Sequence, residues 1–150
     1  MDEIHVIGGK CLHGNITVQG SKNTVLPLMA GALLYRGINV LKACPRITDV
    51  FYMEEILRAL GAETWWEDHD LYLDCTHADG SHVPEIYSGR MRSSIILLGP
   101  ILARNHQAEI GYPGGCVIGK RPVDLHLYVL RRFGAEIKEE EKKITVSCKK

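Results

Sequence analysis

Leu57-Arg58-Ala59-Leu60-Gly61-Ala62-Glu63 recurs 73 residues later as Leu130-Arg131-Arg132-Phe133-Gly134-Ala135-Glu136. Each copy predicts the end of a helix, a glycine that closes it and the start of a strand. The same offset carries Cys75 onto Cys148. Tandem copies of one supersecondary unit bury each other's apolar faces, so the repeat predicts an α/β fold made of at least two copies, with a further copy expected.

Turn residues and apolar patterns around these copies predict the remaining elements. Ser21 is expected to cap a first helix, in which Pro27 is tolerated only near the start, and Pro100 is expected to kink a later helix. The polar segment 75–89 is expected to be a loop. The predicted helices cover 22–35, 49–60, 91–104 and 122–133, and the predicted strands cover 4–7, 12–18, 38–41, 63–66, 71–74, 108–110, 136–138 and 144–147.

Length and composition bound the class of protein. At 150 residues the chain is about one domain long, and its 18 acidic residues cancel 18 basic ones, which argues against general binding to nucleic acid. No run of 18 apolar residues is present, so a membrane helix is not expected. The acidic start at Met1 is unlike a signal peptide. The odd total of five cysteines without paired spacing favours a reducing cytoplasm.

The stretch from Gly111 to His126 concentrates the residues that carry chemistry. Its glycines allow the backbone to approach a ligand closely, and successive N–H groups there can bind an anion. Arg121 offers a rigid fork of donors for a phosphate or carboxylate, and Pro122 suits the first turn of a helix. Cys116 lies among these groups, either as a protonated acid or, if the cations lower its pKa, as a thiolate nucleophile. The sequence therefore predicts an anion site that contains a thiol.

Three segments in the same order as in a known family carry a resemblance along the whole chain. The loop Pro113-Gly114-Gly115-Cys116-Val117-Ile118-Gly119-Lys120-Arg121-Pro122-Val123-Asp124-Leu125-His126 resembles the catalytic loop of the UDP-N-acetylglucosamine 1-carboxyvinyltransferases, an enolpyruvyl transferase family. Gly20-Ser21-Lys22-Asn23 and Met91-Arg92-Ser93-Ser94 resemble two of its substrate-binding segments. Because family members are much longer, the chain is similar to an N-terminal portion.

The resemblance implies transfer of the enolpyruvyl group from phosphoenolpyruvate to UDP-N-acetylglucosamine, the first committed step of peptidoglycan synthesis, in the cytoplasm. It also implies an inside-out α/β barrel of two lobes, each with three βαβαββ repeats, of which two repeats (21–75 and 91–148, joined by 76–90) belong to this chain. Residues 1–20 are expected to pack with the other lobe, a partner that this chain lacks. Without that lobe the chain is expected to be inactive.

The resemblance also assigns site residues. Cys116 becomes the proton donor to the enolpyruvyl methylene carbon, forms a covalent adduct with substrate, and is the target of the epoxide antibiotic fosfomycin. Lys22 and Arg121 become contacts to phosphoenolpyruvate. The sugar nucleotide is expected to be bound by Asn23 and Arg92, with its uridine end at Pro122, Val123, Asp124 and Leu125. Arg92 also opens a helix, where a cation opposes the helix dipole, which independently favours a role in ligand binding.

Other interpretations of the same residues remain open. Cys75, His77 and His82 fit no common zinc pattern, and neither a metal nor another cofactor is expected. A non-catalytic module that binds a sugar nucleotide would use the same residues without chemistry. A thiol redox protein built on Cys116 is weakened by the absence of a Cys-x-x-Cys motif. The related enzyme acting on shikimate 3-phosphate lacks the cysteine-containing loop and fits less well.

Overall fold

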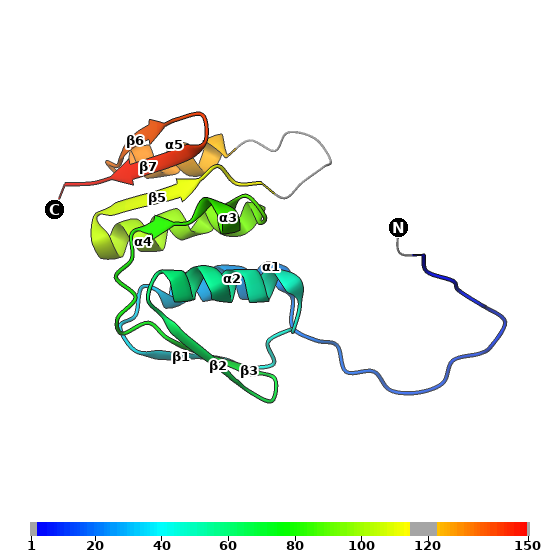
Figure 1. Cartoon of the computed structure of the whole chain (residues 1–150). Helices are drawn as coiled ribbons and strands as arrows, with labels where there is room; N and C mark the ends of the chain where they lie inside the picture. The colour runs from blue at the N-terminus through cyan, green and yellow to red at the C-terminus, as the bar shows by residue number, and fades with distance from the viewer. Residues whose placement is uncertain (1–2, 115–122, 150) are drawn as a thin grey trace.

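The chain folds into two α/β units whose helices face each other between two outer sheets (Figure 1). The computed structural model describes residues 3–114 and 123–149. The first unit contains α1 (Lys22–Ala32), β1 (Ile38–Leu41), α2 (Thr48–Ala59), β2 (Glu63–Glu67) and β3 (Asp70–Asp74). The second contains β4 (His82–Val83), α3 (Glu85–Ser88), the 3-10 helix η1 (Arg92–Leu97), α4 (Leu98–Asn105), β5 (Gln107–Gly111), α5 (Asp124–Arg132), β6 (Glu136–Glu139) and β7 (Lys143–Ser147).

The strand pairing confirms the repeat that the sequence predicts. The first sheet has the order β1-β3-β2 and the second has the order β4-β5-β7-β6, in which β5, β7 and β6 correspond to β1, β3 and β2. Glu63 pairs with Asp74 and, 73 residues later, Glu136 pairs with Ser147, so the second hairpin keeps the register of the first. The added strand β4 runs parallel to β5. Two copies of one unit therefore account for the fold.

The repeated glycine ends a helix in the same way in both units. Gly61 and Gly134 have φ angles of 98° and 90°. The next N–H group, of Ala62 or Ala135, donates to the carbonyl five residues earlier at 2.9 and 3.0 Å. This pattern is a Schellman motif, which needs a left-handed backbone conformation at the glycine. The predicted helix ends are confirmed.

The two glycines are expected to differ when substituted. A residue with an L side chain in the left-handed conformation lowers the free energy of unfolding by roughly 1–2 kcal/mol. Gly134→Ala should cause only this loss, because a Cβ at position 134 meets no atom within 4 Å. A Cβ on Gly61 would lie 2.7 Å from the backbone oxygen of His77, so Gly61→Ala should cost about 3 kcal/mol or more. Urea unfolding of both variants measures the difference. Equal losses would contradict the structure at the Gly61–His77 contact.

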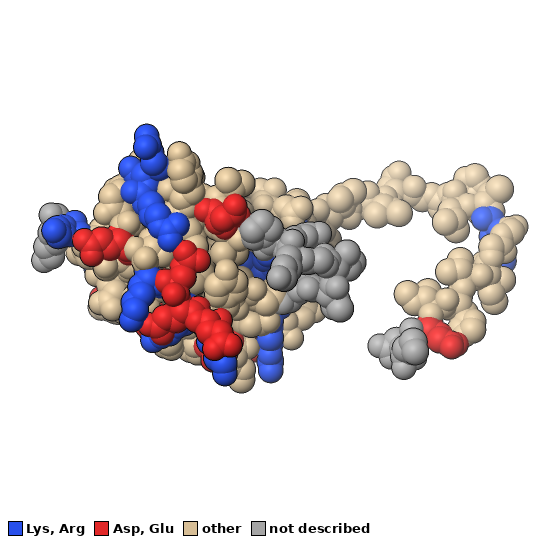
Figure 2. Space-filling view, turned by 90° about the horizontal axis from the view of Figure 1, so that it is seen from above, with Lys and Arg blue, Asp and Glu red and all other residues tan. Residues whose placement is uncertain are grey.

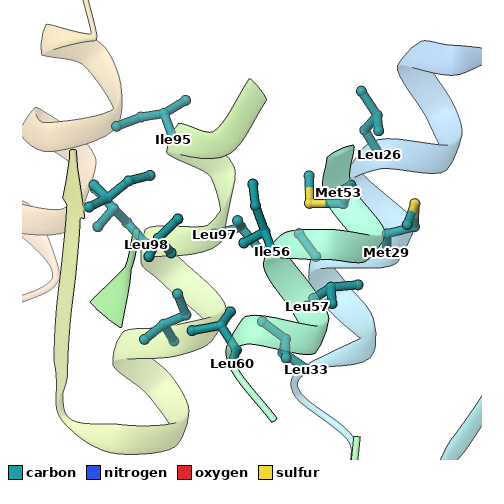
Figure 3. Packing of buried hydrophobic residues seen from close by; sticks show 14 of the residues in the cluster. Leu26, Met29, Leu33, Met53, Ile56, Leu57, Leu60, Ile95, Leu97 and Leu98 are labelled. Atoms are coloured by element: carbon teal, nitrogen blue, oxygen red, sulfur yellow. The ribbon is translucent and has the colours of Figure 1, made fainter. Parts of the chain in front are cut away.

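The core lies between the helices of the two units (Figure 3). Its apolar side chains recur every three or four residues along α1 and α2, the spacing that places them on one face of a helix. That face packs against η1 and α4 of the second unit. The side chains labelled in the figure are Leu26, Met29, Leu33, Met53, Ile56, Leu57, Leu60, Ile95, Leu97 and Leu98.

A buried carboxylate fastens α2 to β2 in the first unit. Glu54 is only 2% exposed and accepts hydrogen bonds from Arg58 at 2.9 Å, Thr64 at 2.9 Å and the Trp66 indole at 3.1 Å. Three donors compensate for the loss of hydration that burial of a charge entails. Trp66 therefore faces the core side, whereas Trp65 on the opposite face is 37% exposed, as the alternation of a strand predicts.

The N-terminal segment departs from its sequence-based prediction. Residues 3–20 contain no strand, so the hairpin expected at 4–7 and 12–18 is not formed. The segment extends away from the two units (Figure 1), and its apolar side chains, such as Ile4 and Ile7, are more than 90% exposed. Strand formation needs a partner that satisfies the backbone and covers one face. The described part of the chain offers neither to this segment.

Two further predictions are corrected. The segment 75–89, expected to be a loop, contains β4 and α3, because Val83 is fully buried and pairs with Ile110 of β5. The first helix begins at Lys22, as predicted, but ends at Ala32 instead of Tyr35. Pro27 lies inside this helix, so the carbonyl of Asn23 cannot receive the usual donor four residues on. No helix in the described ranges is both long enough and apolar enough to span a membrane.

Candidate functional site

A polar cavity of about 490 Å³ lies where the first turns of four helices meet. Lys22 and Asn23 begin α1, Asp49 is the second residue of α2, Arg92 and Ser93 begin η1, and His126 is the third residue of α5. Arg90 lines the cavity from the turn before η1, and Leu26, Met91, Ile95 and Ile96 contribute apolar walls. Residues from both units therefore build one cavity.

The electrostatics of this cavity favour an anion. Helix N-termini carry unpaired N–H groups and the positive end of the helix dipole. Three cations, Lys22, Arg90 and Arg92, line the cavity, and Asp49 is the one carboxylate among its described lining residues. By contrast, acidic and basic side chains are interspersed on the face of the molecule seen in Figure 2. Such a site suits a phosphate or a carboxylate.

Charged contacts already order part of the cavity wall. The Lys22 ammonium lies 3.3 Å from the Asp49 carboxylate, joining the starts of α1 and α2. The Arg90 guanidinium lies 5.8 Å from the ring centre of Tyr52, within range of a cation–π contact. These contacts come from positions 27 and 38 residues apart in sequence, so tertiary packing assembles them.

Small residues bring the end of β5 against the turn that carries Arg90. Gly114 donates to the backbone oxygen of Ser88 at 3.2 Å, and a Cβ on Gly114 would overlap the carbonyl of Gly89. A Cβ on Gly111 would likewise overlap the Ser88 hydroxyl. The glycines are therefore needed for close approach, and they place the described start of the 111–126 stretch beside the cavity wall.

The structure brings together some of the residues predicted from the sequence and separates others. Lys22, Asn23 and Arg92 line the one cavity. Val123 is buried at the start of α5, where Asp124 occupies the first turn. Leu125 is 72% exposed and does not line the polar cavity. Cys116, Arg121 and Pro122 lie outside the described residues.

Leu125 instead lines an apolar groove of about 390 Å³ next to the polar cavity. The two share Ile95, Ile96 and His126, so the imidazole lies on their boundary. Val129 and Leu130 of α5 form the rest of one wall. A ligand with a charged part and a flat or apolar part could occupy both.

Sequence reasoning missed three residues of the polar cavity. In the sequence, the position of Asp49 at a helix start is enough to explain it. Arg90 lies in the segment 76–90, which was expected to be a linker. His126 is the last residue of the loop 113–126 and had no assigned role. Each lies within three residues of a helix start. A search for charged residues within one position of each predicted helix start would have included Asp49 and Arg90.

The four cysteines that the structure describes differ in their surroundings. Burial raises the pKa of the Cys44 thiol to about 11, with a further contribution from Glu54. Burial also raises the pKa of Cys75, against the opposing effect of Arg104. Cys148 is partly exposed, with its sulfur 3.7 Å from Nδ1 of His106, and Cys11 is exposed. Cys44 and Cys75 are therefore protonated and shielded at neutral pH.

The chain matches a known protein family over almost its whole length. The sequence pattern of EPSP synthase (3-phosphoshikimate 1-carboxyvinyltransferase) matches residues 6–150. The chain belongs to the EPSP synthase family. It is 42% identical, over 139 residues, to UDP-N-acetylglucosamine 1-carboxyvinyltransferase 2 of Caldanaerobacter subterraneus subsp. tengcongensis. That alignment covers 93% of this chain and 33% of the relative.

A solved structure in the enolpyruvyl transferase class has the same fold. NikO, an enolpyruvyl transferase from Streptomyces tendae, superimposes with a TM-score of 0.81 at 23% identity, covering 95% of this chain and 32% of that one. The predicted resemblance and α/β fold class are thus confirmed. The chain spans about a third of the length of the Caldanaerobacter relative and of NikO. Its two units form no closed barrel in the described ranges.

Proposed function

We propose that the chain forms part of an enolpyruvyl transferase that moves the enolpyruvyl group of phosphoenolpyruvate to UDP-N-acetylglucosamine for peptidoglycan synthesis in the cytoplasm. The observation that carries this proposal is the meeting of four helix starts and three cations at one cavity. Both substrates bear phosphate groups, which such a cavity attracts. The name of the Caldanaerobacter relative supports the choice of sugar nucleotide over a shikimate substrate.

The site residues then take the following proposed roles. Lys22 and Arg121 bind phosphoenolpyruvate, while Asn23 and Arg92 bind the sugar nucleotide. The uridine end lies at the start of α5, along Pro122, Val123, Asp124 and Leu125. The adjacent apolar groove, with His126 at its boundary, supports this placement because a pyrimidine ring has a flat face to bury.

The chemistry assigned to Cys116 is proton transfer. A sugar hydroxyl oxygen forms a bond to C2 of phosphoenolpyruvate and gives its proton to a base, while the methylene carbon takes a proton from the Cys116 thiol. Loss of a proton from the resulting methyl group then expels inorganic phosphate and leaves the enolpyruvyl ether. Cys116 can also add to phosphoenolpyruvate itself: its sulfur bonds to C2 while the carbon–carbon π bond breaks and the methylene carbon takes up the thiol proton, which gives a covalent adduct that keeps the phosphate.

The proposal extends to the parts of the chain outside the cavity. We infer that residues 1–20 pack with a second lobe, and that 21–75 and 91–148 are two repeats of the first lobe, joined by 76–90. The exposed apolar side chains of residues 3–20 support this assignment, because exposed apolar surface on an extended segment is stabilised by a covering partner.

Thiol labelling tests the proposed function. Fosfomycin, a small anionic epoxide, should modify Cys116 faster than any other cysteine, because the neighbouring cations attract the anion and activate the sulfur. Cys44 and Cys75 should react most slowly because they are buried and protonated. Phosphoenolpyruvate should slow the labelling of Cys116 by occupying the same site. Peptide mapping by mass spectrometry reports each site.

The exposed Cys11 provides the control. Neutral iodoacetamide, which the cations do not attract, should label Cys11 readily. If fosfomycin instead preferred Cys11 or Cys148, or if phosphoenolpyruvate protected no thiol, the proposed role of Cys116 would be refuted.

A second candidate function is a module that binds a sugar nucleotide without catalysis. One observation favours it for this chain alone: Asp49, the one carboxylate among the described residues of the cavity, already pairs with Lys22 and is poorly placed to take a proton from a sugar hydroxyl. This candidate shares the binding residues. It predicts that Cys116 shows no preference for the anionic epoxide.

A further inference from the structure

We propose that Asp49 is a displaceable counter-ion for Lys22, so that a phosphate-bearing ligand enters the cavity in exchange for an internal carboxylate. This inference rests on the proposed function and deepens it. It makes Asp49 a residue that sets the affinity of the cavity for anions.

The geometry of the pair carries the inference. Oδ1 of Asp49 lies 3.3 Å from Nζ of Lys22, close enough for an ion pair. The two side chains are 37% and 50% exposed and both line the cavity, so an entering ligand can reach both. An exposed ion pair of this kind contributes little to stability, so the interactions of a bound ligand can easily exceed it. The pair is therefore strong enough to hold the ammonium and weak enough to open.

The composition of the cavity explains why exchange is favourable. Asp49 provides one carboxylate against three lining cations and several helix N-termini. A phosphate dianion carries more charge and more acceptor oxygens than that carboxylate, and it can meet the ammonium and the helix N–H groups together. The carboxylate also repels an anion within the cavity. Both effects make Asp49 lower the affinity for phosphate.

A purely structural role for Asp49 predicts the opposite result. An acidic residue in the first turn of α2 stabilises the helix through its dipole, and its loss would loosen the wall of the cavity. Anion binding would then weaken. Affinity for phosphate, measured beside folding stability, distinguishes the two roles.

The experiment titrates inorganic phosphate, phosphoenolpyruvate and UDP-N-acetylglucosamine into the 150-residue chain by calorimetry at low ionic strength. Asp49→Asn should bind inorganic phosphate about three- to tenfold more tightly, a gain that 0.5 M salt should largely remove. Asp49→Ser, which keeps a residue favoured at helix starts, should show the same gain if the Asn variant folds poorly. Asp49→Glu should stay within about twofold of the parent because the charge is retained.

Two controls fix the interpretation. Glu55→Gln removes the same charge from an exposed position of α2 that does not line the cavity, and it should change the affinity by less than about 1.5-fold. Lys22→Gln should weaken phosphate binding. Unchanged or weaker phosphate binding by Asp49→Asn and Asp49→Ser, in a protein whose parent binds phosphoenolpyruvate and UDP-N-acetylglucosamine, would overturn the inference alone. No binding of any of the three ligands by the parent would overturn the inference and the proposed function together.

Discussion

Arg104→Leu is expected to lower the free energy of unfolding by about 3–5 kcal/mol, because it leaves several buried carbonyl groups without their donor. The Arg104 side chain is 4% exposed. Its guanidinium donates to the backbone oxygens of Leu33 at 2.8 Å, Cys75 at 2.5 Å and Thr76 at 3.0 Å, and to the Asp79 carboxylate at 3.2 Å. One side chain of the second unit thus satisfies three backbone groups in the first unit and in the segment that follows it. Chemical denaturation measures the loss.

Arg36→Leu is the matched control. Arg36 also pairs with Asp79, at 2.9 Å, but its side chain is 58% exposed, and exposed pairs contribute little. The loss should therefore stay below about 1 kcal/mol. Similar losses for the two arginines would show that Asp79, and not the buried carbonyl groups, gives Arg104 its role.

Asp79 adds a pH dependence to the same cluster. Hydrogen bonds from Arg36 and then Arg104 hold the pKa of Asp79 below its usual value. A carboxylate with a depressed folded-state pKa stabilises the protein above its unfolded-state pKa, and that stability is lost as the pH falls through the folded-state value. The contribution should therefore be present at neutral pH and disappear in acid. Asp79→Asn should reduce the acid sensitivity of unfolding.

The second large effect concerns catalysis. The 150-residue chain by itself is expected to release phosphate from phosphoenolpyruvate in the presence of UDP-N-acetylglucosamine at least about a thousand times more slowly than the Caldanaerobacter relative. Positioned acids and bases accelerate such a reaction by about 10²–10⁴-fold, and correct placement of the two substrates accelerates it further. Lys22, which is 50% exposed, faces solvent, where electrostatic interactions are weak. The described cavity has no carboxylate besides Asp49. A coupled phosphate assay on both proteins measures the ratio.

A rate within tenfold of that relative would contradict this expectation. It would mean that an acid of the chain other than Asp49, or a second copy, completes the site. A heat-denatured sample and a reaction without UDP-N-acetylglucosamine control for spontaneous hydrolysis. The comparison separates a binding module from a complete enzyme.

The repeat made much of the fold predictable from the sequence. Gly61 and Gly134 mark helix ends through a local property, the left-handed conformation that glycine tolerates, and the hairpins that follow keep one register. β4 and α3 were missed because two- and four-residue elements show no usable periodicity, and tertiary pairing with β5 defines them. The N-terminal strands were predicted from alternation alone, but the described chain provides no partner for them.

The candidate site was only partly predictable. Arg92 could be singled out because a cation at a helix start opposes the dipole, a conflict visible in the sequence. That Lys22 and Asp49 would face Arg92 across one cavity depends on how the two units pack, which no local pattern records. The same holds for Arg104, whose partners lie up to 71 residues away. Long-range contacts of this kind need the fold before they can be seen.

The most direct test of the cavity is nuclear magnetic resonance of the ¹⁵N-labelled chain during titration with UDP-N-acetylglucosamine and phosphoenolpyruvate. If the four helix starts bind these anions, the backbone amide signals of Lys22, Asn23, Asp49, Arg92, Ser93 and His126 should shift together and saturate. Signals of Arg58 and Ala59, at the end of α2 opposite to Asp49, should stay in place. Shifts that cluster on that helix end, or no saturable shift at the helix starts, would contradict the account.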